Sequence, residues 1–148
     1  MTHLELRVDI QAPAEAVWNA MTSWTKQGQW MMATKVESLD GDGRHVGARI
    51  SAFTGVGRIG ILDTMTVTQW NPPTSCEVLH TGKIVRGTGE FSVEQIHTQA
   101  SRFIWAEDLE IPLGIIGQLG FLLIKPAFLF GIRRSLAKFA HLVEIGQI

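Results

Sequence analysis

Cysteine is almost missing from this sequence, since Cys76 is the only one among 148 residues. An intramolecular disulfide is therefore excluded, and a reducing compartment suits the chain. Neither sign of charge dominates, because 13 Lys and Arg face 14 Asp and Glu, for a formal net charge of -1. Nucleic-acid binding normally requires a basic face, so this balance predicts no nucleic-acid partner.

Targeting and linker signals are also missing. The N-terminal residues lack a basic stretch followed by an apolar one, which predicts a cytoplasmic protein. There is no internal repeat or low-complexity stretch, and 148 residues are enough to bury a core. We therefore expect one domain, residues 1–148.

Strands dominate the first three quarters of the chain. Leu4, Leu6, Val8 and Ile10 alternate with polar residues, which indicates a half-buried strand. Pro13 then favours the start of a short helix, and a second short helix is expected over 24–30. Alternating runs separated by Gly and Pro turns predict six further antiparallel strands: 35–39, 46–54, 58–70, 76–80, 85–96 and 102–111.

The last part of the chain changes to a helical period. Apolar residues recur every three or four positions, at Phe121, Ile124, Phe128, Ile132, Leu136, Phe139 and Val143. Pro126 lies within this helix, so we expect a kink there. The predicted fold is α+β: a curved seven-stranded antiparallel sheet wrapped around a long C-terminal helix, with two short helices after the first strand. A strongly bent sheet cannot close fully onto one helix, which predicts a cavity.

Several motifs carry a family resemblance over essentially the whole chain. They are Ala12-Pro13 with Val17-Trp18, the run from Val67 to Pro73, the run from Gly87 to Phe91, and Trp105-Ala106-Glu107 before Pro112. With these motifs the chain resembles the START-like, helix-grip superfamily, in the polyketide cyclase/dehydrase and lipid transport branch (SRPBCC). The resemblance implies an apolar pocket between sheet and helix, and it supplies no catalytic residues.

Two acids interrupt apolar strand faces. Asp63 shares its face with Ile61 and Met65, and Glu107 shares its face with Phe103 and Trp105. A buried carboxylate without partners is costly or becomes protonated. One interpretation is that both acids orient or protonate a ligand. The alternative is that a bulge turns one outward, or that each pairs with an arginine such as Arg49 or Arg86.

Aromatic and cationic side chains complete the predicted ligand site. Trp18 and Trp30 are expected near the mouth of the cavity, although ordinary core packing gives aromatic residues the same periods. Lys125 is expected either at the mouth or extended along apolar surface towards water. The predicted ligand-binding residues are Asp63, Met65, Phe91, Trp105, Glu107, Phe121, Lys125 and Phe128.

Other motifs lack the context that their chemistry needs. Residues 55–60 match G-x-G-x-x-G, but strands are predicted on both sides, so no nucleotide cofactor is expected. The histidines are scattered without metal-ligand spacing, which predicts no metal site. Cys76 lies on an alternating strand and is expected to be a small apolar filler.

The segment 111–132 is long and apolar enough to consider a bilayer span. Lys125 and Pro126 interrupt it, and removing it would uncover the sheet, so a core helix is preferred. Leu123, Ala127 and Phe130 point away from the apolar stripe. They predict an exposed patch that docks on a membrane surface or on a second subunit.

The predicted function is binding of a small hydrophobic ligand in the internal cavity, with transport of that ligand as an open extension. Aromatic walls favour a ringed ligand over a straight acyl chain. One alternative is a cyclase, aromatase or dehydratase that acts on a polyketide-like substrate by general acid/base catalysis through Asp63 or Glu107. A second alternative is a membrane-associated accessory protein.

Overall fold

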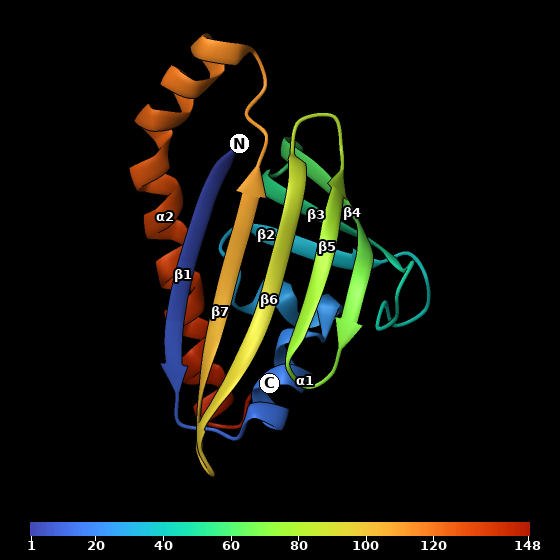
Figure 1. Cartoon of the computed structure of the whole chain (residues 1–148), viewed down its shortest axis with the longest axis vertical. Helices are drawn as coiled ribbons and strands as arrows, with labels where there is room; N and C mark the ends of the chain where they lie inside the picture. The colour runs from blue at the N-terminus through green and yellow to red at the C-terminus, as the bar shows by residue number, and fades with distance from the viewer.

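A computed structural model describes residues 1–148 as a curled antiparallel sheet with helices on its concave side (Figure 1). Seven strands lie in the order β1-β7-β6-β5-β4-β3-β2. The elements in chain order are β1 (Thr2–Ile10), α1 (Ala14–Met21), the 3-10 helix η1 (Trp24–Gln29), β2 (Thr34–Ser38), β3 (Arg49–Val56), β4 (Ile59–Asn71), β5 (Ser75–Thr81), β6 (Arg86–His97), β7 (Ala100–Leu109) and α2 (Gly114–Glu144). The predicted fold class is confirmed.

The sheet is built from consecutive hairpins, apart from one long-range pairing. β1 lies beside β7, with Leu4 opposite Glu107 and Leu6 opposite Trp105. This pairing joins the start of the chain to its last strand. The period-two pattern of β1 is confirmed, because Leu4 and Ile10 are buried while the residues between the apolar positions are exposed.

One end of the concave side is closed by a packed aromatic core. Phe103 of β7 packs against Phe139 of α2 at 5.2 Å between ring centroids, and against Phe91 of β6 at 5.3 Å. Trp30 contacts Phe139 at 4.8 Å. Trp30 is almost fully buried in this cluster. Trp18 is also almost fully buried, and its ring packs against Trp70. The prediction that Trp18 and Trp30 lie at a cavity mouth is wrong, because α1 packs against β6 and β7 and η1 packs against β2.

The two halves of α2 have different surroundings. In the second half Ile132, Leu136, Phe139 and Val143 are buried, as predicted, and the amide of Met32 donates to Ser135 Oγ at 2.9 Å. In the first half Ile124 is 60% exposed, contrary to its predicted place on the buried stripe. Figure 1 shows the reason: α2 runs alongside β1 at the edge of the sheet, so its first half is covered on one side only.

The β2–β3 and β3–β4 connections differ in length. The loop between β2 and β3 covers residues 39–48 and is longer than the turn expected between the predicted strands 35–39 and 46–54, because Asp40 accepts hydrogen bonds from the backbone and side chain of Arg49 and fixes the start of β3 there. The glycine motif at 55–60 lies in the β3–β4 hairpin, where Gly57 has a φ of +61°. Strands therefore flank it on both sides, as predicted.

The aromatic core should carry much of the stability. Replacing Phe139 by Ala removes a fully buried ring that contacts two other aromatic rings, so the free energy of unfolding should fall by about 3–5 kcal/mol. Chemical denaturation measures this loss. Leu123→Ala on the same helix is the control, because Leu123 is 83% exposed and its replacement should change stability by less than about 0.5 kcal/mol. Equal losses for both variants would contradict the division of α2 into two halves.

Candidate functional site

Three ionisable side chains meet on the concave face of the sheet. His80 of β5 lies between Asp63 of β4 and Glu107 of β7. Its Nδ1 is 2.8 Å from Asp63 Oδ2 and 3.0 Å from Asp63 Oδ1, and its Nε2 is 2.7 Å from Glu107 Oε2. We call these three residues the carboxylate–imidazole network.

The strand register explains how the network forms. His80 is paired with Met65 on β4, so Asp63 is its diagonal neighbour, two residues along the same face. Glu107 must reach across β6 to meet His80, and the residue opposite it there is Gly89. A Cβ atom at Gly89 would lie 2.9 Å from both oxygens of the Glu107 carboxylate. The missing side chain at this position therefore leaves the space in which the carboxylate lies.

The sequence prediction identified the two acids and missed the histidine between them. A signal was present, because Cys76, Val78 and His80 alternate along β5 and share one face. The spacing of the histidines along the chain does not connect any of them with the two acids. This contact depends on cross-strand register, which that spacing does not give.

Both structural alternatives for the acids are wrong. The irregularity in β4 lies between Val67 and Gln69, away from Asp63. Arg49 pairs with Asp40, and Arg86 lies 3.8 Å from Glu110. The acids are instead stabilised by a histidine on the same face of the sheet.

The network holds a proton strongly. Burial by itself lowers the pKa of His80, but hydrogen bonds to Asp63 and Glu107 outweigh this effect and raise the pKa to about 10. His80 is therefore an imidazolium at neutral pH, and each ring N–H donates to a carboxylate. Burial also raises the pKa of Glu107 above its ordinary value, an effect that the hydrogen bond from His80 partly offsets. The hydrogen bond between His80 Nε2 and Glu107 Oε2 therefore links the protonation of these two side chains.

Exposure varies along the network. The side chains of His80 and Glu107 are 4% and 10% exposed, whereas that of Asp63 is 17% exposed. A ligand on the concave face would therefore find Asp63 the most accessible of the three. The network can orient a polar group and exchange a proton with it. Its three side chains form a row in which both ring nitrogens are already engaged, and they do not converge as metal ligands do.

The other predicted ligand-binding residues fall into two groups. Trp105 is buried, Met65 and Phe91 are partly buried, and Phe128 packs against Trp105 at 6.2 Å between ring centroids, so these four lie on or against the concave face. Phe121 and Lys125 instead line a crevice between α2 and the N-terminus of the chain. Lys125 makes no ion pair with Glu107, whose carboxylate is engaged by His80.

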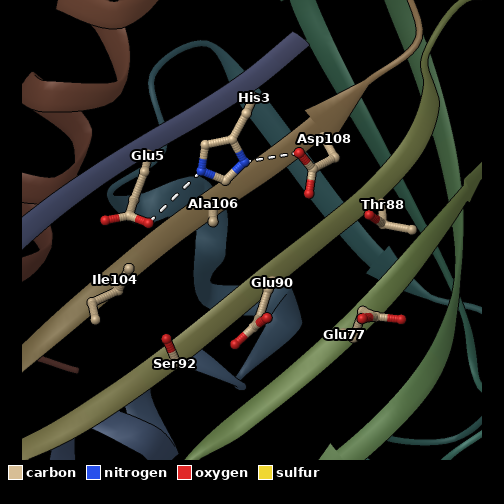
Figure 2. Close-up of a pocket in the computed structure, with 9 residues that line it drawn as sticks. All are labelled: His3, Glu5, Glu77, Thr88, Glu90, Ser92, Ile104, Ala106 and Asp108. Atoms are coloured by element: carbon tan, nitrogen blue, oxygen red, sulfur yellow. Dashed lines mark hydrogen bonds and ion pairs between the residues drawn. The ribbon is translucent and has the colours of Figure 1, made fainter. Parts of the chain in front are cut away.

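A second hollow lies on the outer face of the sheet and is polar (Figure 2). Its lining is rich in acids, and His3 Nδ1 lies 2.8 Å from Asp108 Oδ1. That hydrogen bond raises the pKa of the exposed His3. Small side chains such as Ala106 and Ser92 form the floor of the hollow. Polar and acidic side chains dominate this hollow, so it is poorly suited to an apolar ligand.

Known structures share this architecture. The chain has the START-like helix-grip fold: a START superfamily protein from Mycobacterium smegmatis matches with a TM-score of 0.72 at 14% identity, covering 90% of this chain and 93% of that one. The model of the family described as polyketide cyclase / dehydrase and lipid transport matches residues 1–144, and the chain belongs to this family. No curated protein sequence matches the chain.

Two further known structures share the fold at low sequence identity. The Zhui aromatase/cyclase from Streptomyces sp. R1128 has a TM-score of 0.77 at 18% identity, covering 97% of this chain and 93% of that one. The Aha1 dimer from Colwellia psychrerythraea has a TM-score of 0.66 at 19% identity, covering 100% of both chains. At these identities the likeness establishes the fold alone.

The proton on His80 should make stability depend on pH. The pKa of His80 is about 10 in the folded chain against 6.5 as its ordinary value, so the stabilisation is fully present below pH 6.5 and is lost as the pH rises through 10. Over this window the contribution falls by up to about 1.4 kcal/mol per pH unit. Urea denaturation at several pH values measures it. His80→Gln should flatten the dependence, whereas His97→Gln, at an exposed histidine on β6, should leave it unchanged.

The space above Gly89 should control the network. In Gly89→Ala the new methyl group displaces the Glu107 carboxylate and weakens its hydrogen bond to His80, so the pKa of His80 should fall from about 10. An NMR titration of the His80 ring measures this change. Gly120→Ala is the control for a glycine replacement, because nothing lies within 4 Å of a Cβ at that position of α2 and its φ is not in the left-handed region. An unchanged His80 titration in Gly89→Ala would mean that Glu107 does not need this space.

Proposed function

We propose that the chain binds a small apolar ligand that carries one hydrogen-bonding group. The ligand lies on the concave side, between the sheet and α2, and its polar group contacts Asp63 at the accessible end of the network. The observation that carries this proposal is a buried carboxylate–imidazole–carboxylate row on an otherwise apolar face. Apolar side chains of similar size would stabilise such a face at least as well, so an ionised row there favours a role in recognition.

The surroundings of the network support a ringed ligand. Trp105 and Phe91 lie opposite each other on β7 and β6, and Phe128 of α2 packs against Trp105. Aromatic walls favour flat, ringed molecules, because rings stack in offset or edge-on arrangements. Membership of a family described by polyketide cyclisation and lipid transport supports the same class of ligand.

A second candidate function is general acid/base catalysis, as in a cyclase, aromatase or dehydratase of polyketide-like substrates. The specific observation in its favour is that Glu107 and His80 both have raised pKa values and share one hydrogen bond. Such a pair can hold a proton in a water-poor site and pass it to a substrate through Asp63 or Glu107. The aromatase/cyclase with the same fold is consistent with this candidate.

We also propose that residues 1–148 act as a single domain and that the protein is cytoplasmic. Cys76 supports this location, because it is the only cysteine and is buried as a small core residue. Burial raises the pKa of its thiol to about 12, so it is a poor nucleophile at neutral pH.

Two ringed probes that differ in one hydroxyl group test the binding proposal. 2-Naphthol should bind more tightly than naphthalene, because its hydroxyl donates to a carboxylate of the network. Asp63→Asn should reduce this preference by about tenfold, the usual value of one hydrogen bond to a charged group. Isothermal titration calorimetry measures both affinities. Glu110→Gln, at an exposed acid just beyond β7, is the matched control.

The two candidate functions separate in a second experiment. Native mass spectrometry of freshly purified protein identifies any co-purified small molecule, which is then incubated with the protein and followed for conversion. Turnover that is lost in Glu107→Gln favours the enzyme, and binding without any conversion favours the carrier. If neither naphthalene nor 2-naphthol bound and no molecule co-purified, the proposed binding function would be wrong.

A further inference from the structure

The first half of α2, residues 114–131, presents an unusual surface to the solvent. An 18-residue window of α2 has a mean hydropathy of 1.8, and 0% of it is buried in the structure. Large apolar side chains along it are exposed to solvent: Ile115 is 76% exposed, Ile116 78% and Leu123 83%. The exposed apolar set is completed by Leu119, Leu122, Ile124, Phe128 and Phe130. We call these eight residues the apolar arc.

The polarity of this half-helix is inverted. Its only polar side chains are Gln118 and Lys125. Both line the crevice against Met1 and Thr2, which Phe121 and the edge of Leu122 also line, on the side that faces the rest of the chain. At 100° per residue, the apolar arc covers more than about half of the helix circumference, on the solvent side. A surface helix in water has the opposite arrangement, so this half-helix is suited to an apolar surrounding.

We propose that the apolar arc inserts into one leaflet of a lipid bilayer, with α2 lying along the membrane surface. This surface adjoins the proposed ligand site at Phe128, which packs against Trp105, and its other residues lie outside that site. A second copy of the chain would contact a narrower strip of one helix and leave the rest of the arc in water. Lipid tails surround the whole arc at once. A helix that is apolar on every solvent-facing side is otherwise found in protein cores or in membranes.

The charges on α2 favour an anionic membrane. No acidic residue occurs from 111 to 143, while Arg133, Arg134 and Lys138 follow the apolar arc and are exposed. The guanidinium of Arg134 lies 5.9 Å from the ring centre of Phe130, so the cationic and apolar surfaces adjoin. The outer face of the sheet, in contrast, carries several acids (Figure 2). Basic side chains beside an inserted apolar surface bind anionic headgroups.

Vesicle flotation tests the apolar part of the proposal. The full chain should float with vesicles of phosphatidylcholine and phosphatidylglycerol. The double variant Leu123→Asp with Phe130→Asp should bind at least about tenfold more weakly, because two apolar side chains are replaced by charges. Leu39→Asp with Val46→Asp is the matched control, since these residues are 50% and 60% exposed near the β2–β3 loop, on the far side of the molecule from α2 (Figure 1). Thermal unfolding should confirm that both double variants fold.

A second pair of substitutions tests whether the basic residues bind anionic headgroups. Arg133→Glu with Arg134→Glu should weaken binding to the anionic vesicles by about tenfold and leave binding to pure phosphatidylcholine vesicles nearly unchanged. Failure of the full chain to float with either kind of vesicle would overturn the proposal. So would a dimer in analytical ultracentrifugation that Leu123→Asp dissociates and that does not float, because the arc would then be covered by a second copy. The naphthol binding tests do not depend on either outcome.

Discussion

The low polarity of the concave face is the constraint on which the rest of the structure depends. This face buries α1, η1 and the second half of α2, so most residues that point into it are apolar. A charge on such a face is stable only if it finds its partner there. Asp63 and Glu107 meet this condition through His80, and Gly89 supplies the space for the contact. The same constraint therefore accounts for the packed core and for the chemistry of the network.

Local patterns in the sequence predicted most of the fold. Period-two alternation located all seven strands to within a few residues, and the helical period located α2, because both patterns record which side of an element is buried. The network was only half predictable. An acid on an apolar row is visible in one strand, but its partner depends on the register of β4, β5, β6 and β7 together. His80 is visible on the apolar row of β5, but spacing along the chain does not show that it meets the two acids.

The helix α2 shows a second limit of sequence patterns. Apolar residues at helical spacing predict a buried stripe, and this is correct from Ile132 onwards. The same pattern wrongly predicts that Ile124 is buried, because spacing along the helix does not tell how far the sheet extends beside it. The exposure of Leu123, Ala127 and Phe130 was predicted, since they lie off the stripe. Their neighbours on the stripe are exposed as well, which turns a small patch into the apolar arc.

The two ends of the molecule thus divide stability from function. At the closed end, rings such as Phe103 and Phe139 are fully buried and should resist opening. At the other end lie a charged row that burial disfavours and a half-helix that buries little of its surface. The half-helix adds little to folding, and functional elements are drawn from regions of low local stability. A ligand would contact the accessible end of the network at Asp63. A membrane would cover the apolar arc, which the folded chain leaves exposed to water. Because the second half of α2 is fixed in the core, the first half can change its surroundings without loss of the fold.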